Sequence, residues 1–349
     1  MVKGLSDLRA WVVAGLVLAN VTLPLAASAS KASVAAAPVQ PEHVVLVVLE
    51  GVGQDALKSG PMPALGRLVK EGAVTWSATG VNPPLRLPTM ASLFTGLPVE
   101  KHGITWNTFD FIRGYPRPPT VFDYLDLSGG RDSAIFFMDE ALYQLAKPEP
   151  YTDYQMCGPL KPECSAATIV GYIREYFRKA SSGHGYGHAI LSLPHLLVVH
   201  LPQPGRAGAA QGWHSPAYRE SLRNVDQAIG SILGIYRELG LLGRTTVFVT
   251  AINNTGEAKG VQGGEAAGAS LPRIPWIAWG AGIKPGYSIK QPVSIMDTGA
   301  TVMRTLGLET HTEWESRAVE EIFSAPRPAS VDPAMDRGGA VGIDGKVRP

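Results

Sequence analysis

The chain has 349 residues, of which 45% are hydrophobic and 17% are charged, and its formal net charge is +1. This length accommodates one large domain or two small ones, and the composition is that of an ordinary globular protein. No basic excess is present to release counterions from a polyanion, so we expect no nucleic acid among its partners.

The N-terminus has the residue order of a secretory signal peptide. Positively charged residues precede an apolar stretch from Trp11 to Ala19, and small residues follow up to Ala29. We predict a signal peptide over 1–29, and therefore an exported protein, periplasmic or extracellular, with no membrane span after cleavage. The alternative is an uncleaved anchor, but the apolar stretch is shorter than the ~20 residues that a spanning helix needs. Residues 30–42 are predicted to form a flexible leader.

Short runs of β-branched and apolar residues recur along the rest of the chain, and helical patterns separate them. This alternation predicts an α/β fold with a buried and largely parallel sheet. The predicted strands are 43–49, 73–77, 133–137, 195–201, 245–251 and 274–279.

The clearest predicted helix spans 216–239. Ser215 is a suitable N-cap, a proline follows it in the first turn, and apolar residues then recur at three- and four-residue spacing. A second helix is predicted at about 165–180.

The predicted organisation is one main domain over 43–325. Its less regular part, about 108–190, is interpreted as core elements plus a small insertion over the C-terminal edge of the sheet, where α/β folds place their sites. The tail 326–349 is rich in Pro, Gly and Asp and is predicted to be disordered.

The chain contains two cysteines, Cys157 and Cys164. In an exported protein, a close pair is a candidate disulfide. Free thiols and half of a metal site are the alternatives.

Two blocks of the chain carry a family resemblance. In the first, from Val44 to Asn107, an apolar run ends at Glu50-Gly51 and is followed by Leu85-Arg86-Leu87-Pro88-Thr89. The second runs from Ile274 to Gly286. These blocks resemble the alkaline phosphatase superfamily, and within it the type I phosphodiesterases and nucleotide pyrophosphatases, over about 43–322. The resemblance implies an alkaline-phosphatase-like three-layer α/β/α sandwich with a mostly parallel central sheet.

In that family, aspartates and histidines hold two zinc-type ions that activate a threonine or serine nucleophile. The resemblance places the first metal-binding position on Glu50 and the nucleophile on Arg86, whose guanidinium cannot attack phosphorus. Asn107, 21 residues after Arg86, matches the asparagine that steadies the phosphate. The remaining family ligand positions fall on Gly205, Ala209, Ala251, Ile252 and Gln262.

Only Glu50 among these positions ligates a metal well, and Gln262 does so weakly, whereas zinc sites need three or four donors. We therefore expect no cofactor and no catalytic residue of the family type; misalignment is the alternative explanation. A buried carboxylate without a metal is costly. We predict that Arg86 pairs with Glu50 in place of the metal. In the alternative, both side chains are solvated separately, with their charged ends beyond 4 Å.

Several histidines are candidates for a rebuilt site. His184 and His188 are four residues apart, but the glycines between them favour a surface loop. His200, at a strand end, and His214, before a helix, could face the pocket, although each alone is more often a structural histidine. His102 matches a family position where histidine is structural.

These observations favour an exported pseudoenzyme that has lost metal-dependent phosphodiesterase activity. Its pocket, formed by Glu50, Arg86 and Asn107, is expected to bind a phosphate- or sulfate-bearing small molecule. One alternative is an active phosphodiesterase or phosphatase-type hydrolase with a rearranged site and a divalent zinc-type metal. A second alternative is a structural or assembly protein, and the sequence leaves the identity of any protein partner unknown.

Overall fold

The computed structural model describes residues 40–110, 112–128, 130–146, 154–156, 164–182, 185–186, 189–190, 192–253 and 271–325. The predicted signal peptide and the tail lie outside these residues, as does the leader except for 40–42. No helix within the described ranges is long and apolar enough to cross a membrane.

A mixed sheet forms the centre of the domain. Within the described residues it has eight strands in the order β10-β2-β9-β8-β1-β7-β3-β4. The strands are β1 (His43–Leu49), β2 (Ala73–Thr79), β3 (Ser133–Phe136), β4 (Tyr154–Met156), β7 (Leu196–Leu201), β8 (Thr245–Ala251), β9 (Arg273–Gly280) and β10 (Tyr287–Ser288). A separate antiparallel pair consists of β5 (Gly185–Tyr186) and β6 (Ala189–Ile190).

All six predicted strands are present, and the prediction of a mostly parallel sheet is confirmed. β1 lies between β7 and β8 and is parallel to both, and β3 is parallel to β7 and β4. β9 is the exception, because it is antiparallel to both β2 and β8. Within 108–190, β3 and β4 belong to the central sheet.

Helices connect and cover the strands. The α-helices are α1 (Gln54–Ser59), α2 (Pro63–Glu71), α3 (Arg86–Thr95), α4 (Val99–His102), α5 (Val121–Leu127), α6 (Ala166–Ser181), α7 (Gln203–Gln211), α8 (Pro216–Glu238) and α9 (Asp297–Thr305). Short 3₁₀ turns are η1 (Glu140–Gln144), η2 (Leu242–Arg244) and η3 (Glu320–Ile322). The two clearest predicted helices correspond to α6 and α8, and the hydroxyls of Ser165 and Ser215 cap their N-termini.

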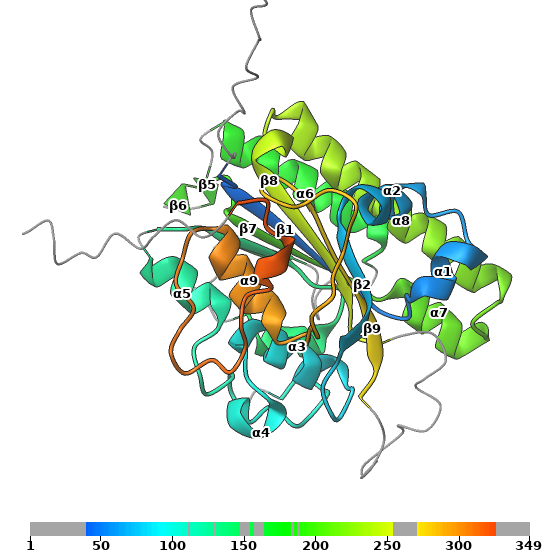
Figure 1. Ribbon diagram of the computed structural model, residues 1–349, viewed down its shortest axis with the longest axis horizontal. Coiled ribbons are helices and arrows are strands. Elements are labelled where there is room, and N and C mark those ends of the chain that lie inside the picture. Colours follow the sequence, from blue (N-terminus) through cyan, green and yellow to red (C-terminus); the bar gives the residue numbers. More distant parts are fainter. Residues whose placement is uncertain are drawn as a thin grey trace, which may run out of the picture. The chain divides into compact units, whose positions relative to one another are not determined.

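Alternating side chains of β1 divide the core into two layers. Val44, Leu46 and Val48 pack with α3, α5 and α9 on one face of the sheet. The intervening residues Val45, Val47 and Leu49 pack with α2, α6 and α8 on the other face. Figure 1 shows the two groups of helices on opposite sides of the strands. The three-layer α/β/α architecture therefore follows from a fully buried strand that presents apolar side chains to both faces.

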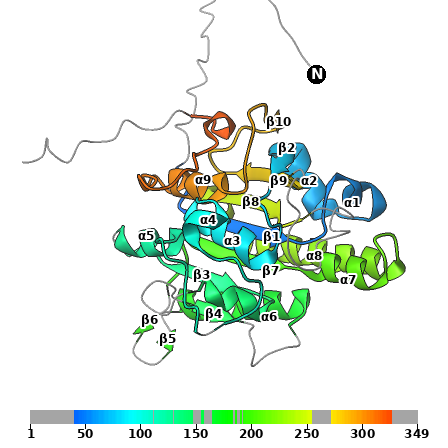
Figure 2. The same cartoon turned by 90° about the horizontal axis from the view of Figure 1, so that it is seen from below.

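The carboxyl ends of β1, β3, β7 and β8 lie at one edge of the sheet, because these strands run in the same direction. Helices α1 and α7 lie side by side beyond this edge in both views (Figures 1 and 2). The loops that follow the parallel strands therefore meet at one place, where α/β folds position their functional residues.

Candidate functional site

A cluster of charged side chains lies at the carboxyl edge of the sheet. Glu50 directly follows β1, His200 lies within β7, and Asp139 is the third residue after β3. Arg86 is the first residue of α3. Four segments that are distant in sequence therefore contribute to one cluster.

Glu50 and Arg86 form the predicted ion pair. Arg86 Nη2 donates to Glu50 Oε2 at 2.9 Å, and Arg86 Nε donates to Glu50 Oε1. This is the two-point arrangement in which a planar guanidinium matches a carboxylate. The Glu50 side chain is only 6% exposed, so the pair compensates a charge that would otherwise be buried alone.

His200 also forms a hydrogen bond with the Glu50 carboxylate. Its Nε2 lies 2.8 Å from Glu50 Oε1, and the ring is fully buried. Burial lowers the pKa of His200, although the bond to Glu50 acts in the opposite direction. We therefore assign a neutral ring whose Nε2–H donates to Glu50. Its buried Nδ1 has no hydrogen-bond partner among the described residues.

The pKa values of the pair describe a fully ionised site. Burial by itself would raise the pKa of Glu50, but hydrogen bonds from His200 and Arg86 lower it to about 2. Burial would likewise lower the pKa of Arg86, but the hydrogen bond to Glu50 and the charges of Glu50 and Asp139 raise it overall. Both side chains are therefore charged at neutral pH.

A second carboxylate extends the cluster toward solvent. Asp139 Oδ2 accepts from Arg86 Nη1 at 2.8 Å and from Arg206 Nη2 at 2.9 Å. Asp139 Oδ1 accepts from the backbone N–H of Ala141 at 3.0 Å and so caps η1. Two arginines from different helices thus bind a single oxygen atom of one carboxylate.

Asn107 fixes the start of the helix that carries Arg86. Its Oδ1 accepts from the backbone N–H of Leu87 at 2.9 Å, which satisfies one of the unpaired donors of the first helical turn. The helix begins at Arg86, and Pro88 is tolerated in its first turn because a first-turn N–H needs no helical partner. Of the predicted pocket residues, Glu50 and Arg86 pair directly, and Asn107 bonds the residue next to Arg86.

The peptide of Gly51 is held on both sides. Its N–H donates to Asn253 Oδ1 at 2.7 Å, and its carbonyl accepts from the Tyr218 hydroxyl at 2.8 Å. Gly51 has a φ of 68°, a left-handed conformation that favours glycine. The loop after β1 is therefore fixed by Asn253, which follows β8, and by Tyr218 of α8.

Gly205, at a predicted family ligand position, packs directly against Glu50. A Cβ on Gly205 would lie 2.8 Å from the Glu50 Cβ, and a Cβ on Gly51 would lie 2.6 Å from the Gly205 Cα. The Trp213 ring packs across the same helix, where a Cβ on Gly208 would lie 2.2 Å from it. Helix α7 thus approaches β1 so closely that no side chain fits at position 205.

The other family ligand positions that the structure describes are also unsuited to a metal. Ala209 is exposed on α7, and Ala251 and Ile252 are buried apolar residues. Gln262 lies outside the described residues. Within the described part of the chain, no group of three His, Cys, Asp or Glu is arranged to hold a metal ion. The donors present there therefore do not fit the zinc-type site of the family, which needs three or four ligands.

The remaining predictions have mixed outcomes. His102 is buried, contacts the Ser92 hydroxyl at 2.9 Å, and accepts from the N–H of Ile104 at 3.0 Å, so its role is structural. His214 is exposed. His184, His188 and Cys157 lie outside the described residues, so the His pair and the disulfide of Cys157 with Cys164 stay predictions.

Sequence reasoning missed Asp139, Arg206 and Asn253. Asp139 and Asn253 follow β3 and β8, so the rule that strand ends converge could have found both. No comparable signal pointed to Arg206. Its position depends on α7, a helix whose glycines have low helix propensity.

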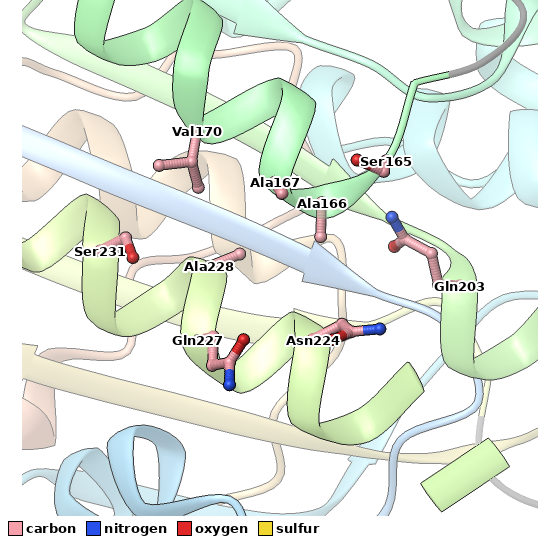
Figure 3. Close-up of a pocket in the computed structure, with 9 residues that line it drawn as sticks. All are labelled: Ser165, Ala166, Ala167, Val170, Gln203, Asn224, Gln227, Ala228 and Ser231. Atoms are coloured by element: carbon pink, nitrogen blue, oxygen red, sulfur yellow. The ribbon is translucent and has the colours of Figure 1, made fainter. Parts of the chain in front are cut away.

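A separate cavity of about 350 Å³ lies between α6 and α8 (Figure 3). Its walls include Ser165 and Val170 on one side and Asn224 and Gln227 on the other. Gln203 at the start of α7 closes one end. None of its lining residues is ionisable, so this cavity offers neither an acid–base pair nor a charged anchor.

Comparisons with known sequences show that the chain is similar to phosphodiesterases and to sulfatases. Residues 44–251 match the family model described as type I phosphodiesterase / nucleotide pyrophosphatase. N-acetylgalactosamine-6-sulfatase of Sus scrofa is 24% identical over 367 residues, which cover 87% of this chain and 69% of that protein. Steryl-sulfatase of Rattus norvegicus is 31% identical over 140 residues, 35% of this chain, and the match spans about a quarter (23%) of that protein.

Solved structures share the fold. Murine ectonucleotide pyrophosphatase/phosphodiesterase 5 in complex with AMP superposes with a TM-score of 0.60 at 15% identity, covering 81% of this chain and 100% of that chain. The phosphonate monoester hydrolase of Silicibacter pomeroyi gives 0.57 at 14% identity, covering 83% and 78%. A protein solved with its substrate D-glucosamine-2-N,6-O-disulfate gives 0.59 at 13% identity, covering 83% and 82%. The predicted alkaline-phosphatase-like fold is confirmed by these likenesses.

Proposed function

Since this chain belongs to the type I phosphodiesterase / nucleotide pyrophosphatase family of the alkaline phosphatase superfamily, we propose that it is a non-hydrolytic member. It binds a phosphate- or sulfate-bearing small molecule without a metal ion. The observation that carries this proposal is the Glu50–Arg86 pair, in which a guanidinium takes both carboxylate oxygens at the position expected to hold a metal.

Three features support the loss of hydrolysis. The position of the family nucleophile carries Arg86, which has no nucleophilic atom at accessible pH. A metal at Glu50 would have to displace a permanently charged guanidinium. Gly205 leaves no space for a further ligand beside Glu50.

Two features support binding of an oxyanion. Arg86 and Arg206 are forked donors suited to phosphate and sulfate oxygens. Structures with the same fold have been solved with AMP and with a disulfated glucosamine. We extend that ligand class to this chain, as a group recognised by arginine side chains rather than by metal ions.

The test combines metal analysis with an activity assay on the purified full chain. Zinc and manganese are expected well below one ion per chain, and hydrolysis of an aryl phosphodiester such as bis(4-nitrophenyl) phosphate is expected at background. The Arg86→Thr variant should stay inactive, because it restores a nucleophile without metal ligands. Stoichiometric zinc together with turnover by the unmodified chain would overturn the proposal.

A structural or assembly role is a second candidate. The close approach of Gly205 to Glu50, with Trp213 packed over α7, favours it, because this packing fills space beside the cluster. A purely structural domain would bind neither metal nor oxyanion, so the binding measurement below separates the two candidates.

We also propose that the protein is exported after cleavage of residues 1–29. The order of charged, apolar and small residues in that segment supports this. N-terminal sequencing of the secreted protein should begin at Ser30, and an intact Met1 on membrane-bound protein would contradict cleavage.

A further inference from the structure

Two arginines converge on one oxygen atom of Asp139. Arg86 reaches Oδ2 from α3 at 2.8 Å, and Arg206 reaches the same atom from α7 at 2.9 Å. The two arginines lie on different helices that are distant in sequence, so the convergence does not follow from local sequence. A carboxylate oxygen in this position occupies the place that an oxygen of a sulfate or phosphate group takes between paired guanidinium groups.

The charges of the cluster are balanced in two pairs. Glu50 takes two donors of Arg86, and Asp139 bridges the third donor of Arg86 to Arg206. If the Asp139 carboxylate leaves, Arg206 loses this ion-pair partner and, among the described residues, keeps the bond from Nη2 to the Met138 carbonyl oxygen, at 2.9 Å. The two arginines would then carry one positive charge in excess of Glu50.

The cluster is buried at Glu50 and opens toward solvent at Arg206. The side chain of Glu50 is 6% exposed, that of Asp139 is 16% exposed, and that of Arg206 is 48% exposed. A ligand from solvent therefore reaches Asp139 and Arg206 before it reaches Glu50. The Glu50–Arg86 pair can stay intact while the outer pair is exchanged.

We propose that Arg86 and Arg206 form a binding site for the terminal oxyanion of a sulfate or phosphate group, and that Asp139 is an internal anion that occupies this site until the ligand replaces it. This inference rests on the proposed function, because it specifies how the metal-free site recognises its ligand. Asp139 competes with the ligand for the two arginines. The apparent affinity for the ligand is therefore the intrinsic affinity multiplied by the fraction of molecules in which Asp139 has left the site.

The variant Asp139→Asn tests the competition directly. Asparagine keeps an oxygen for the Ala141 N–H that caps η1, so the turn is retained, but it removes the negative charge. Titration calorimetry with inorganic sulfate and with inorganic phosphate, in the presence of a chelator, should show at least ~10-fold tighter binding to this variant than to the unmodified chain. The matched control Asp126→Asn, on α5, should bind as the unmodified chain does.

Further variants and ligands locate the anion. The double variant Asp139→Asn/Arg206→Gln should lose the gain in affinity. Phenyl sulfate and phenyl phosphate show which form of the anion the site takes. If it takes the end group of an ester, these esters should bind more tightly than the inorganic ions. If it takes a free ion, only the inorganic ions should bind. In the unmodified chain, saturating ligand should increase amide hydrogen exchange at Ala141, because the cap of η1 moves with Asp139.

Two results would overturn the inference: equal affinity of the Asp139→Asn variant and the unmodified chain for both ions, or a gain that survives the loss of Arg206. Either result, obtained with metal-free and inactive protein, removes the internal-anion inference and leaves the loss of hydrolysis standing. Stoichiometric zinc with turnover instead removes the proposed function itself, whatever the anion titrations give.

Discussion

Gly205 lies against Glu50 with no room for a single added carbon between them. A Cβ at position 205 would lie 2.8 Å from the Glu50 Cβ and 3.1 Å from the Glu50 carbonyl carbon. The family resemblance places a metal-binding aspartate at this position, whereas here the backbone of α7 packs directly against Glu50. Any side chain at position 205 would require α7 to lie farther from Glu50.

Replacement of this glycine should be destabilising. We expect Gly205→Ala to lower the free energy of unfolding by about 2 kcal/mol, since overpacking a filled site costs about 1–3 kcal/mol. The matched control is Gly234→Ala on α8, where nothing lies within 4 Å of an added Cβ. That control should raise stability by about 0.5–1 kcal/mol through helix propensity. Urea unfolding measures both, and a neutral Gly205→Ala would contradict the packing described here.

Loss of Arg86 should leave the buried carboxylate of Glu50 without its cation. We expect Arg86→Gln to cost about 3 kcal/mol in unfolding free energy, the lower end for breaking one side of a buried pair. The double variant Glu50→Gln/Arg86→Gln should cost at least about 1 kcal/mol less than the sum of the single variants, because residues in contact couple. Additive losses would show that the two side chains act independently.

Acid should destabilise the fold through the same cluster. The pKa of His200 is below its ordinary 6.5, so the unfolded chain takes up a proton that the folded chain refuses, and stability falls as the pH drops below about 6.5. The pKa of Glu50 falls from 4.5 to about 2, so its contribution is present above 4.5 and is lost between these values.

Urea unfolding at pH 7.5, 6, 5 and 4 measures this decline. His200→Gln should show a shallower slope between pH 6.5 and 5 than the unmodified chain. His102 and His195 also have lowered pKa values, so the difference between the two slopes, rather than either slope alone, reports on His200. Identical slopes would count against a neutral, buried His200.

The side chain of Asn253 should contribute through one hydrogen bond. It accepts from the Gly51 N–H at 2.7 Å, and its loss leaves that donor in the loop after β1 without its partner. We expect Asn253→Ala to lower the unfolding free energy by about 1–2 kcal/mol. Asn224→Ala, at an exposed position of α8, is the control and should change it by less than about 0.5 kcal/mol.

Removal of metal ions should leave the protein unchanged. If the site contains only its own side chains, no binding free energy is lost to a chelator. We expect the melting temperature of the full chain to shift by less than about 1 °C in excess EDTA, and equally little on addition of zinc. A substantial fall in EDTA that zinc restores would reveal a bound ion.

The strands and the inner ion pair could be predicted because each rests on a strong physical requirement. A strand such as β1, buried on both faces, needs a continuous apolar sequence, and this is visible from Val44 to Leu49. Once the family resemblance placed Arg86 opposite Glu50, the cost of an unpaired buried carboxylate predicted their contact.

The outer part of the site could not be predicted in the same way. Helix α7 contains Gly205 and Gly208, whose low helix propensity conceals it in the sequence. Trp213 packs on Gly208 and Glu50 packs on Gly205, and these tertiary contacts hold the helix that carries Arg206. Asp139 joins the cluster only through the cap of η1, a local conformation that strand periodicity does not indicate.

The place of β1 in the sheet has a consequence for biosynthesis. Both of its neighbours, β7 and β8, are made late, since Leu49 pairs with Leu201 and with Ala251. While the ribosome adds the intervening residues, this apolar strand has no hydrogen-bonding partner within the sheet. Long-range parallel pairing of this kind is slow, and it leaves aggregation-prone apolar segments exposed until the strands pair. Mutations that slow the pairing of β1 should therefore reduce yield before they reduce the stability of the finished fold.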